Sequence, residues 1–153
     1  MLLYFLRHGE ADWPDWKKPD DERPLTKNGK TEMGEVAAFL KRIKAKPDLI
    51  VTSPLPRASQ TAEIAADRLK IKCREDKLLE PGFNRPDLER LLQKYPEENL
   101  MIVGHEPDFS EVIAELTGAS LKLSKAGIAL VDLNRSSRGG RLLWLIPPKI
   151  ATR

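Results

Sequence analysis

The chain has 153 residues, of which 41% are hydrophobic and 32% are charged, and its formal net charge is +3 at pH 7. This length predicts one domain over residues 1–153 and excludes a large multidomain protein, while the composition excludes an intrinsically disordered chain. The single cysteine excludes an internal disulfide framework and a cysteine-based zinc site, and the mild positive charge lacks the dense basic stripe typical of nucleic-acid binding.

The start of the chain predicts a buried strand, a long loop and a helix. Residues 2–6 form a continuous apolar run, which is typical of a strand buried on both faces of a sheet. Residues 9–24 hold three prolines and two tryptophans and predict a loop of a length that is often functional. A helix is expected over about residues 27–45, with Thr26 as its N-cap and Pro47 beyond its end. Its apolar face would consist of Met33, Val36, Ala37, Leu40 and Ile43.

The rest of the chain predicts alternating strands and helices, followed by a hairpin. Strands are expected near residues 49–51, 71–73, 100–103, 127–133 and 141–146, with 136–140 as the hairpin loop and a loose tail after Pro148. Helices are expected over residues 57–69, from Pro86 onwards, and from Pro107 to just before Gly118. This order predicts an α/β fold: a three-layer α/β/α sandwich with a mainly parallel sheet and an antiparallel edge hairpin.

Both histidines of the chain follow an apolar strand and have a glycine beside them. His8 follows the first strand in Leu6-Arg7-His8-Gly9, and His105 follows the 100–103 strand in Val103-Gly104-His105. Because ligands of open parallel sheets bind beyond the carboxyl ends of the strands, we expect the two imidazoles at the same edge. Either histidine alone is explained more simply by a structural hydrogen bond, but the pair favours a functional site.

Three arginines are candidates for the same edge. Arg7 precedes His8, Arg57 stands where the second strand passes into a helix, and Arg23 in the long loop could reach them. Guanidinium groups at a helix N-terminus suit phosphate, although a solvated surface charge is the usual fate of an arginine. Imidazoles among guanidiniums favour a phosphate dianion over a metal cation, and a neutral imidazole there can attack phosphorus.

Four segments resemble motifs of the histidine phosphatase superfamily, which has the phosphoglycerate mutase-like fold. They occur in the family's order, and the resemblance covers nearly the whole chain. The segments are Leu6-Arg7-His8-Gly9-Glu10, Arg23-Pro24-Leu25-Thr26-Lys27-Asn28-Gly29, Ser53-Pro54-Leu55-Pro56-Arg57-Ala58-Ser59-Gln60-Thr61-Ala62 and Val103-Gly104-His105. Within this superfamily, the chain resembles the bacterial SixA-type protein-phosphohistidine phosphatases in particular. The resemblance rests on the short length of the chain and on the segments Gly104-His105-Glu106-Pro107 and Ser124-Lys125-Ala126-Gly127.

This resemblance implies a role for each candidate residue. His8 would be the nucleophile that becomes phosphohistidine, with Arg7, Arg57 and His105 forming the catalytic phosphate pocket. Arg23 would be a further phosphate contact, and no metal or organic cofactor is implied.

Glu80, in Leu78-Leu79-Glu80-Pro81-Gly82, falls near the place where many members of the superfamily carry a general acid. It is either that acid or a solvated loop carboxylate. A phosphohistidine substrate would need less help from an acid, because imidazole is a better leaving group than an alkoxide.

The favoured hypothesis is a phosphatase that acts on a phosphohistidine-bearing protein and releases inorganic phosphate. No run approaches the roughly 20 apolar residues that span a bilayer, and no signal-peptide core is visible, so we expect a cytoplasmic protein without a membrane or nucleic-acid partner. The first alternative is a phosphatase of small sugar or nucleotide phosphates on the same fold. The others are a phosphate-binding module without catalysis and a two-histidine metal protein.

Overall fold

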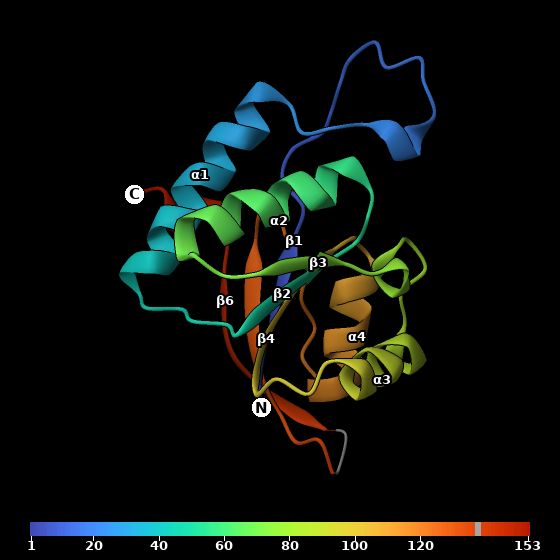
Figure 1. Ribbon diagram of the computed structural model, residues 1–153, viewed down its shortest axis with the longest axis vertical. Coiled ribbons are helices and arrows are strands. Elements are labelled where there is room, and N and C mark those ends of the chain that lie inside the picture. The colour runs from blue at the N-terminus through green and yellow to red at the C-terminus, as the bar shows by residue number, and fades with distance from the viewer. Residues whose placement is uncertain (137–138) are drawn as a thin grey trace.

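Six strands form one sheet in the computed structural model, which describes residues 1–136 and 139–153 (Figure 1). They are β1 (Leu2–Arg7), β2 (Leu49–Thr52), β3 (Cys73–Glu75), β4 (Asn99–Gly104), β5 (Ile128–Leu133) and β6 (Gly140–Ile146). Their order is β3–β2–β4–β1–β5–β6; the first four are parallel, and β5 pairs antiparallel with both β1 and β6. The predicted sheet is therefore confirmed, although residues 137–138 of the predicted hairpin loop lie outside the described residues.

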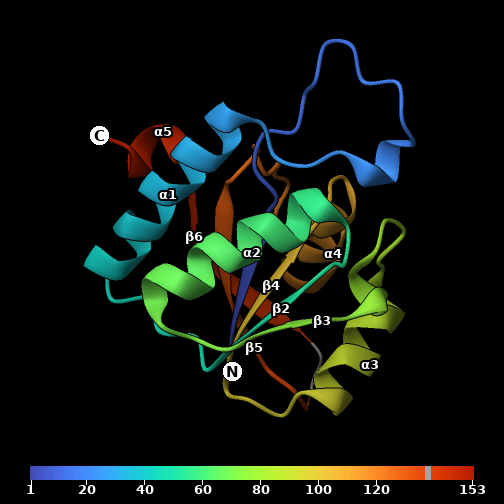
Figure 2. The ribbon, with the colours of Figure 1, turned by 45° about the horizontal axis from the view of Figure 1, so that its top comes forward.

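Helices cover both faces of the sheet and complete the three predicted layers. They are α1 (Lys27–Arg42), α2 (Pro56–Leu69), α3 (Arg85–Lys94), α4 (Asp108–Thr117) and α5 (Pro148–Ala151), with short 3₁₀ turns η1 (Asp20–Glu22) and η2 (Lys77–Leu79) in the loops. α1 and α2 pack on one face, and α3 and α4 on the other (Figures 1 and 2). None of the helices in the described ranges is long and apolar enough to cross a membrane.

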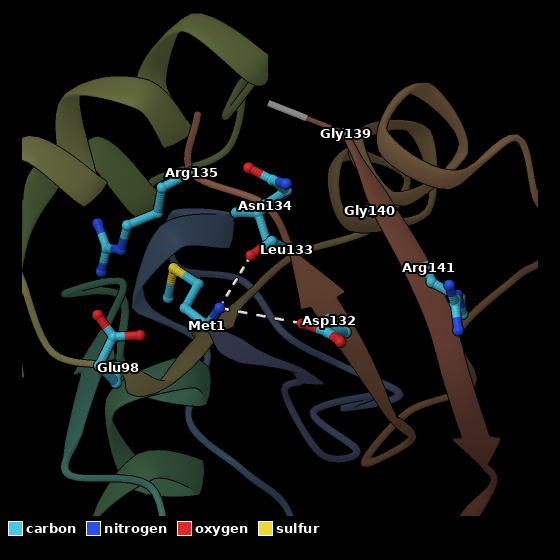
Figure 3. Close-up of a pocket in the computed structure, with 9 residues that line it drawn as sticks. All are labelled: Met1, Glu98, Asp132, Leu133, Asn134, Arg135, Gly139, Gly140 and Arg141. Atoms are coloured by element: carbon cyan, nitrogen blue, oxygen red, sulfur yellow. Dashed lines mark hydrogen bonds and ion pairs between the residues drawn. The ribbon is translucent and has the colours of Figure 1, made fainter. Parts of the chain in front are cut away.

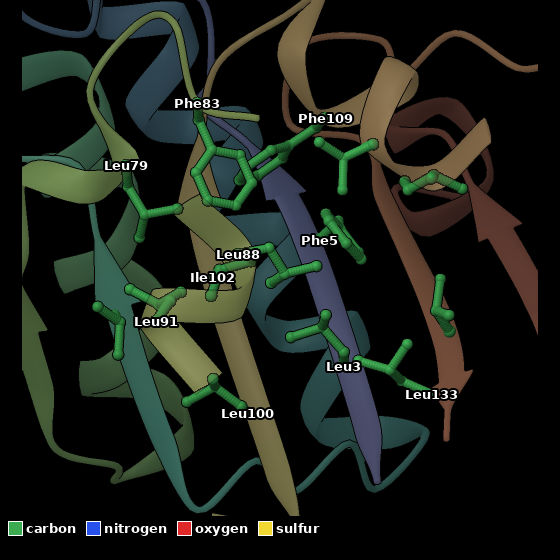
Figure 4. Packing of buried hydrophobic residues seen from close by; sticks show 14 of the residues in the cluster. Leu3, Phe5, Leu79, Phe83, Leu88, Leu91, Leu100, Ile102, Phe109 and Leu133 are labelled. Carbon is green, nitrogen blue, oxygen red and sulfur yellow. The ribbon is translucent and has the colours of Figure 1, made fainter. Parts of the chain in front are cut away.

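The central strand β1 contributes side chains to both hydrophobic cores. Leu3 and Phe5 pack with α3 and α4 (Figure 4), whereas Tyr4 and Leu6 pack with α1 and α2. All four side chains are buried, because successive residues of a strand point to opposite faces and helices cover both. This explains why the first strand is a continuous apolar run rather than an alternating one.

Helix α1 ends at Arg42, three residues before the predicted end near Ala45. Lys44 has a φ of 60°, in the left-handed region, and the Ala45 amide donates a 3.0 Å hydrogen bond to the Leu40 carbonyl, so the chain turns there towards β2. Ile43, predicted on the apolar face, falls in this turn and is 42% exposed. The other predicted residues of that face are buried.

The third strand and the C-terminal tail also differ from the prediction. β3 is Cys73–Glu75 rather than residues 71–73, because the Ile71 amide still donates to the Ala66 carbonyl at the end of α2. Residues 148–151 form α5 instead of a loose tail. Pro148 and Ala151 are buried, and Ala151 belongs to the core cluster between α1 and the sheet, so apolar packing holds this segment in place.

Candidate active site

The two histidines lie side by side at the carboxyl edge of the sheet. β1 and β4 are neighbouring parallel strands, with Arg7 paired with Gly104, so the next residue of each strand is a histidine. The ring centroids of His8 and His105 are 5.4 Å apart, although 97 positions separate them in the sequence. A Cβ atom on Gly104 would lie 2.7 Å from the Phe109 ring, so only glycine lets β4 run this close to α4 beneath His105.

The environment of His8 fixes both its tautomer and its charge. Its Nδ1 lies 2.7 Å from the Gly9 carbonyl oxygen, which can only accept, so Nδ1 carries the proton and the lone pair is on Nε2. Burial, together with the positive charges of Arg57, Arg7 and Arg23, lowers the pKa of His8 to about 4. His8 is therefore a neutral imidazole at pH 7 with Nε2 free to act as a nucleophile.

His105 is buried, with only 4% of its surface exposed, and has a partner on one ring nitrogen only. Its Nε2 lies 2.8 Å from the Ser53 hydroxyl oxygen, and its Nδ1 is buried without a hydrogen-bond partner in the described part of the chain. Burial, followed by repulsion from His8 and the two nearby arginines, lowers its pKa to about 3. Ser53 stands in the second arginine motif, but the sequence analysis did not assign it a role in the site.

Arg7 and Arg57 each have a buried guanidinium nitrogen that has no hydrogen-bond partner among the described residues. Arg7 Nη1 donates to the Leu123 carbonyl at 2.9 Å, and Arg57 Nη1 donates to the Asp20 carbonyl at 3.1 Å. These nitrogens are the Nε atoms of the two arginines, and within residues 1–136 and 139–153 His105 Nδ1 is likewise buried without a partner. Three nitrogens that are buried away from water thus belong to residues beside His8. Such nitrogens are suited to donate hydrogen bonds to a bound oxyanion.

Arg23 lies at the outer side of this cluster, where Asp20 holds it. Arg23 Nε donates to Asp20 Oδ1 at 2.8 Å, and its Nη1 donates to the Ala11 carbonyl at 2.7 Å. Asp20 Oδ2 is also 3.7 Å from Arg57 Nη2, so one carboxylate faces two of the three arginines. Asp20 was not predicted as a site residue, and its position three residues before Arg23 in a polar loop is the signal that could have pointed to it.

Glu80 is not joined to either histidine by any hydrogen bond or ion pair among the described residues. Its backbone N–H donates to the Lys77 carbonyl, and its own carbonyl accepts from Phe83. The following turn is tied to α4, because the Gly82 amide donates to Asp108 Oδ2 at 2.8 Å. The role of Glu80 as a general acid therefore stays a prediction.

A chain of hydrogen bonds behind Arg7 was not visible in the sequence. Glu106 accepts from the Ser110 hydroxyl at 2.6 Å and from the Ser110 amide at 2.8 Å. The Ser110 oxygen in turn accepts from the Leu123 amide at 3.1 Å, and the Leu123 carbonyl is the acceptor for Arg7. A buried hydroxyl on α4 thus holds the loop segment that orients a guanidinium of the site.

Two cavities flank the fold at opposite ends. One, of about 680 Å³, lies by the Met1 ammonium, Asp132 and Arg141 at the edge of the sheet away from the histidines (Figure 3). The other, of about 620 Å³, is an open groove that includes Arg7 and so adjoins the histidine cluster. No group of three or more His, Cys, Asp or Glu side chains in the described part of the chain could hold a metal ion.

Comparison with known proteins gives matches along the whole chain. The family model of the histidine phosphatase superfamily (branch 1) matches residues 3–81. An uncharacterised protein of Picosynechococcus is 39% identical over 137 residues, which are 84% of this chain and 82% of that protein. Phosphohistidine phosphatase SixA of Escherichia coli is 30% identical over 155 residues, covering 97% of this chain and 94% of SixA. A solved structure of the protein histidine phosphatase SixA complexed with tungstate has a TM-score of 0.87 and 28% identity, covering 98% of this chain and 99% of that one.

Proposed function

The chain belongs to the histidine phosphatase superfamily, and we propose that it removes the phosphoryl group from protein phosphohistidine through a covalent intermediate on His8. The observation that carries this proposal is the neutral His8, whose Nε2 is free, beside three buried nitrogens that lack a partner among the residues the structure describes. Those nitrogens belong to Arg7, Arg57 and His105, the residues proposed to hold the phosphate.

In the first step, the lone pair of His8 Nε2 attacks phosphorus. The bond from phosphorus to the substrate imidazole breaks, and its electron pair stays on the departing nitrogen, which takes up a proton from solvent or from a nearby acid. Arg7 and Arg57 stabilise the negative charge on the transferred oxygens, and Arg23 adds positive charge from the outer side. His8 is held in line by its Nδ1–H hydrogen bond to Gly9.

In the second step, water attacks the phosphorus of the phosphorylated His8. The phosphorus–nitrogen bond breaks and its electron pair returns to Nε2. The water oxygen becomes a hydroxyl of inorganic phosphate, and its second proton passes to a phosphate oxygen or to solvent. Burial and the neighbouring arginines keep the imidazole of His8 neutral, so the freed Nε2 can accept the next phosphoryl group. Both steps use side chains of this chain alone, and the proposal includes no metal or organic cofactor.

One observation favours phosphohistidine over an ester of a small molecule. Structures of comparable coverage include SixA and a mycobacterial glucosyl-3-phosphoglycerate phosphatase, and SixA resembles this chain more in both sequence and structure.

The test is phosphate release by chelator-treated protein from a phosphohistidine-bearing protein, a phosphoserine peptide and a sugar phosphate. We expect release from phosphohistidine, and we expect His8→Ala to lower the rate by more than about a thousandfold while the protein stays folded by circular dichroism. Near-normal turnover by folded His8→Ala would show that His8 is not the nucleophile. Preference for the sugar phosphate would indicate that the substrate is a small phosphate ester. Loss of activity with chelator would indicate that the reaction needs a metal.

A further inference from the structure

The groove beside Arg7 is large enough to hold more than the phosphorylated imidazole. Its volume is about 620 Å³, within the range of pockets that hold drug-sized ligands, whereas one imidazole and its phosphoryl group fill only part of such a space. It shares Arg7 with the phosphate cluster, so an occupant of the groove would be adjacent to the phosphoryl group. Its charged lining residues are Arg7, Lys122, Lys125, Lys149, Glu10 and Glu32.

The loop that carries two of these lysines is fixed to the strand of the nucleophile. Leu123, next to Lys122, is held on both sides, since its amide donates to Ser110 and its carbonyl accepts from Arg7. Further along, the Ala126 amide donates to the His8 carbonyl at 3.1 Å. The loop from Lys122 to Ala126 therefore keeps a set position relative to His8, as a preformed binding surface does.

Positive side chains outnumber negative ones in the groove, and two of its lysines are available to contact a partner. Lys125 forms an ion pair with Asp12 of the long loop. Lys122 and Lys149 are exposed and form no ion pair with any other residue that the structure describes. Free ammonium groups beside a phosphate site attract and orient negatively charged partners.

We propose that this groove, through Lys122 and Lys149, binds an acidic segment of the phosphorylated protein next to its phosphohistidine. The proposal rests on the proposed function and adds a preference among substrates: carboxylates flanking the phosphohistidine lower KM. The flexible, exposed lysines act through charge rather than through fixed geometry, so the preference is strongest at low ionic strength.

The test uses two chemically phosphorylated peptides that differ only beside the phosphohistidine, where one has four glutamates and the other has four glutamines. Phosphoimidazole is the third substrate, because it reaches the phosphate site but leaves the groove empty. The groove variant is Lys122→Glu/Lys149→Glu. The matched control is Lys46→Glu/Lys72→Glu, which reverses two exposed lysines near the start of β2 and β3, at the other edge of the sheet.

At low salt, we expect wild type and the control variant to prefer the glutamate peptide by about tenfold in kcat/KM, mainly through KM. The groove variant should lose or reverse this preference and turn over phosphoimidazole at the wild-type rate. If wild type shows no preference, or if the groove variant keeps it, the groove proposal is wrong while the phosphatase activity stands. If wild type releases phosphate from none of the three substrates, the proposed function fails, and the groove proposal fails with it.

Discussion

The floor and the rim of the candidate site are built in different ways. The floor consists of His8, His105, Arg7 and Arg57, which lie at strand and helix ends. The register of β1 against β4 holds the first three, and Arg57 lies in the first turn of α2, after β2, which also pairs with β4. The rim is the loop of residues 9–26 (Figure 2), which is held mostly by contacts within itself. Trp13 Nε1, for example, donates to the Pro24 carbonyl at 2.9 Å, and the Trp13 side chain is still 40% exposed.

The floor holds the candidate reacting groups in place, whereas the rim surrounds them. A floor residue cannot move without disturbing the central strands of the sheet, whose side chains are almost fully buried. A rim residue can move at the cost of a few exposed hydrogen bonds. Changes in the floor should therefore have large effects on catalysis or folding, and changes in the rim should have small ones.

The junction between the rim and helix α1 provides the largest expected effect on stability. A Cβ atom on Gly29 would lie 2.2 Å from the Glu10 carbonyl oxygen, where the rim loop packs on the first turn of α1, whereas one on Gly34 would meet nothing within 4 Å. We expect Gly29→Ala to destabilise the protein by about 1–3 kcal/mol through overpacking. Gly34→Ala in the same helix should stabilise it by about 0.5–1 kcal/mol.

Urea unfolding of wild type and of the two alanine variants measures both changes in the free energy of unfolding. The comparison is sharp because both changes add one methyl group to the same helix. Equal stabilities for the two variants would mean that the loop does not pack against Gly29 as described.

Ser110→Ala tests whether the floor depends on its support from α4. The change removes the acceptor of the Leu123 amide, so the acceptor of Arg7 is no longer held in place. We expect kcat/KM to fall by about tenfold, corresponding to the loss of one buried hydrogen bond, and inorganic phosphate to inhibit more weakly. Ser120→Ala, an exposed serine of the adjoining loop, is the control.

The readout that separates positioning from general destabilisation is the phosphate inhibition constant, measured well below the unfolding temperature of each variant. An inhibition constant equal to that of wild type, with only the unfolding temperature lowered, would assign Ser110 a structural role alone.

The histidines of the floor should titrate far below the ordinary histidine range. Folding lowers the pKa of His8 to about 4 and that of His105 to about 3, so the unfolded chain binds more protons than the folded one between those values and about 6.5. This contribution to stability is present above about pH 6.5 and is lost as the pH falls towards 4. Histidine NMR titration checks it, and midpoints near 6.5 would contradict the burial of the site.

Asp20→Asn in the rim should have the smallest effect. The side chain of Asp20 is 70% exposed, and its ion pairs with Arg23 and Arg57 are in contact with water, so their contribution to stability is below about 1 kcal/mol. We expect the unfolding temperature to change by no more than a few degrees and kcat/KM by less than about threefold. A tenfold loss would show that the rim positions the arginines as firmly as the floor does.

The floor was predictable because its residues follow directly from strand ends. A buried strand needs a continuous apolar run, the residue after it emerges at the carboxyl edge, and parallel strands bring such residues together. The partners Ser53 and Ser110 were not predictable, because their hydrogen bonds depend on how helices and loops pack on the sheet. The packing of α5 on α1 escaped prediction for the same reason, since two prolines in sequence predict only the end of a strand.

The central place of β1 has a consequence for synthesis of the chain on the ribosome. His8 and β1 are made before their neighbours in the sheet, β4 and β5, which begin only at Asn99 and Ile128. A nascent chain shorter than this holds His8 on an unpaired apolar strand, where no buried pocket lowers its pKa and no guanidinium is in place. The proposed activity thus requires synthesis of the chain at least through β5, and shorter translation products carry the motif without the folded site.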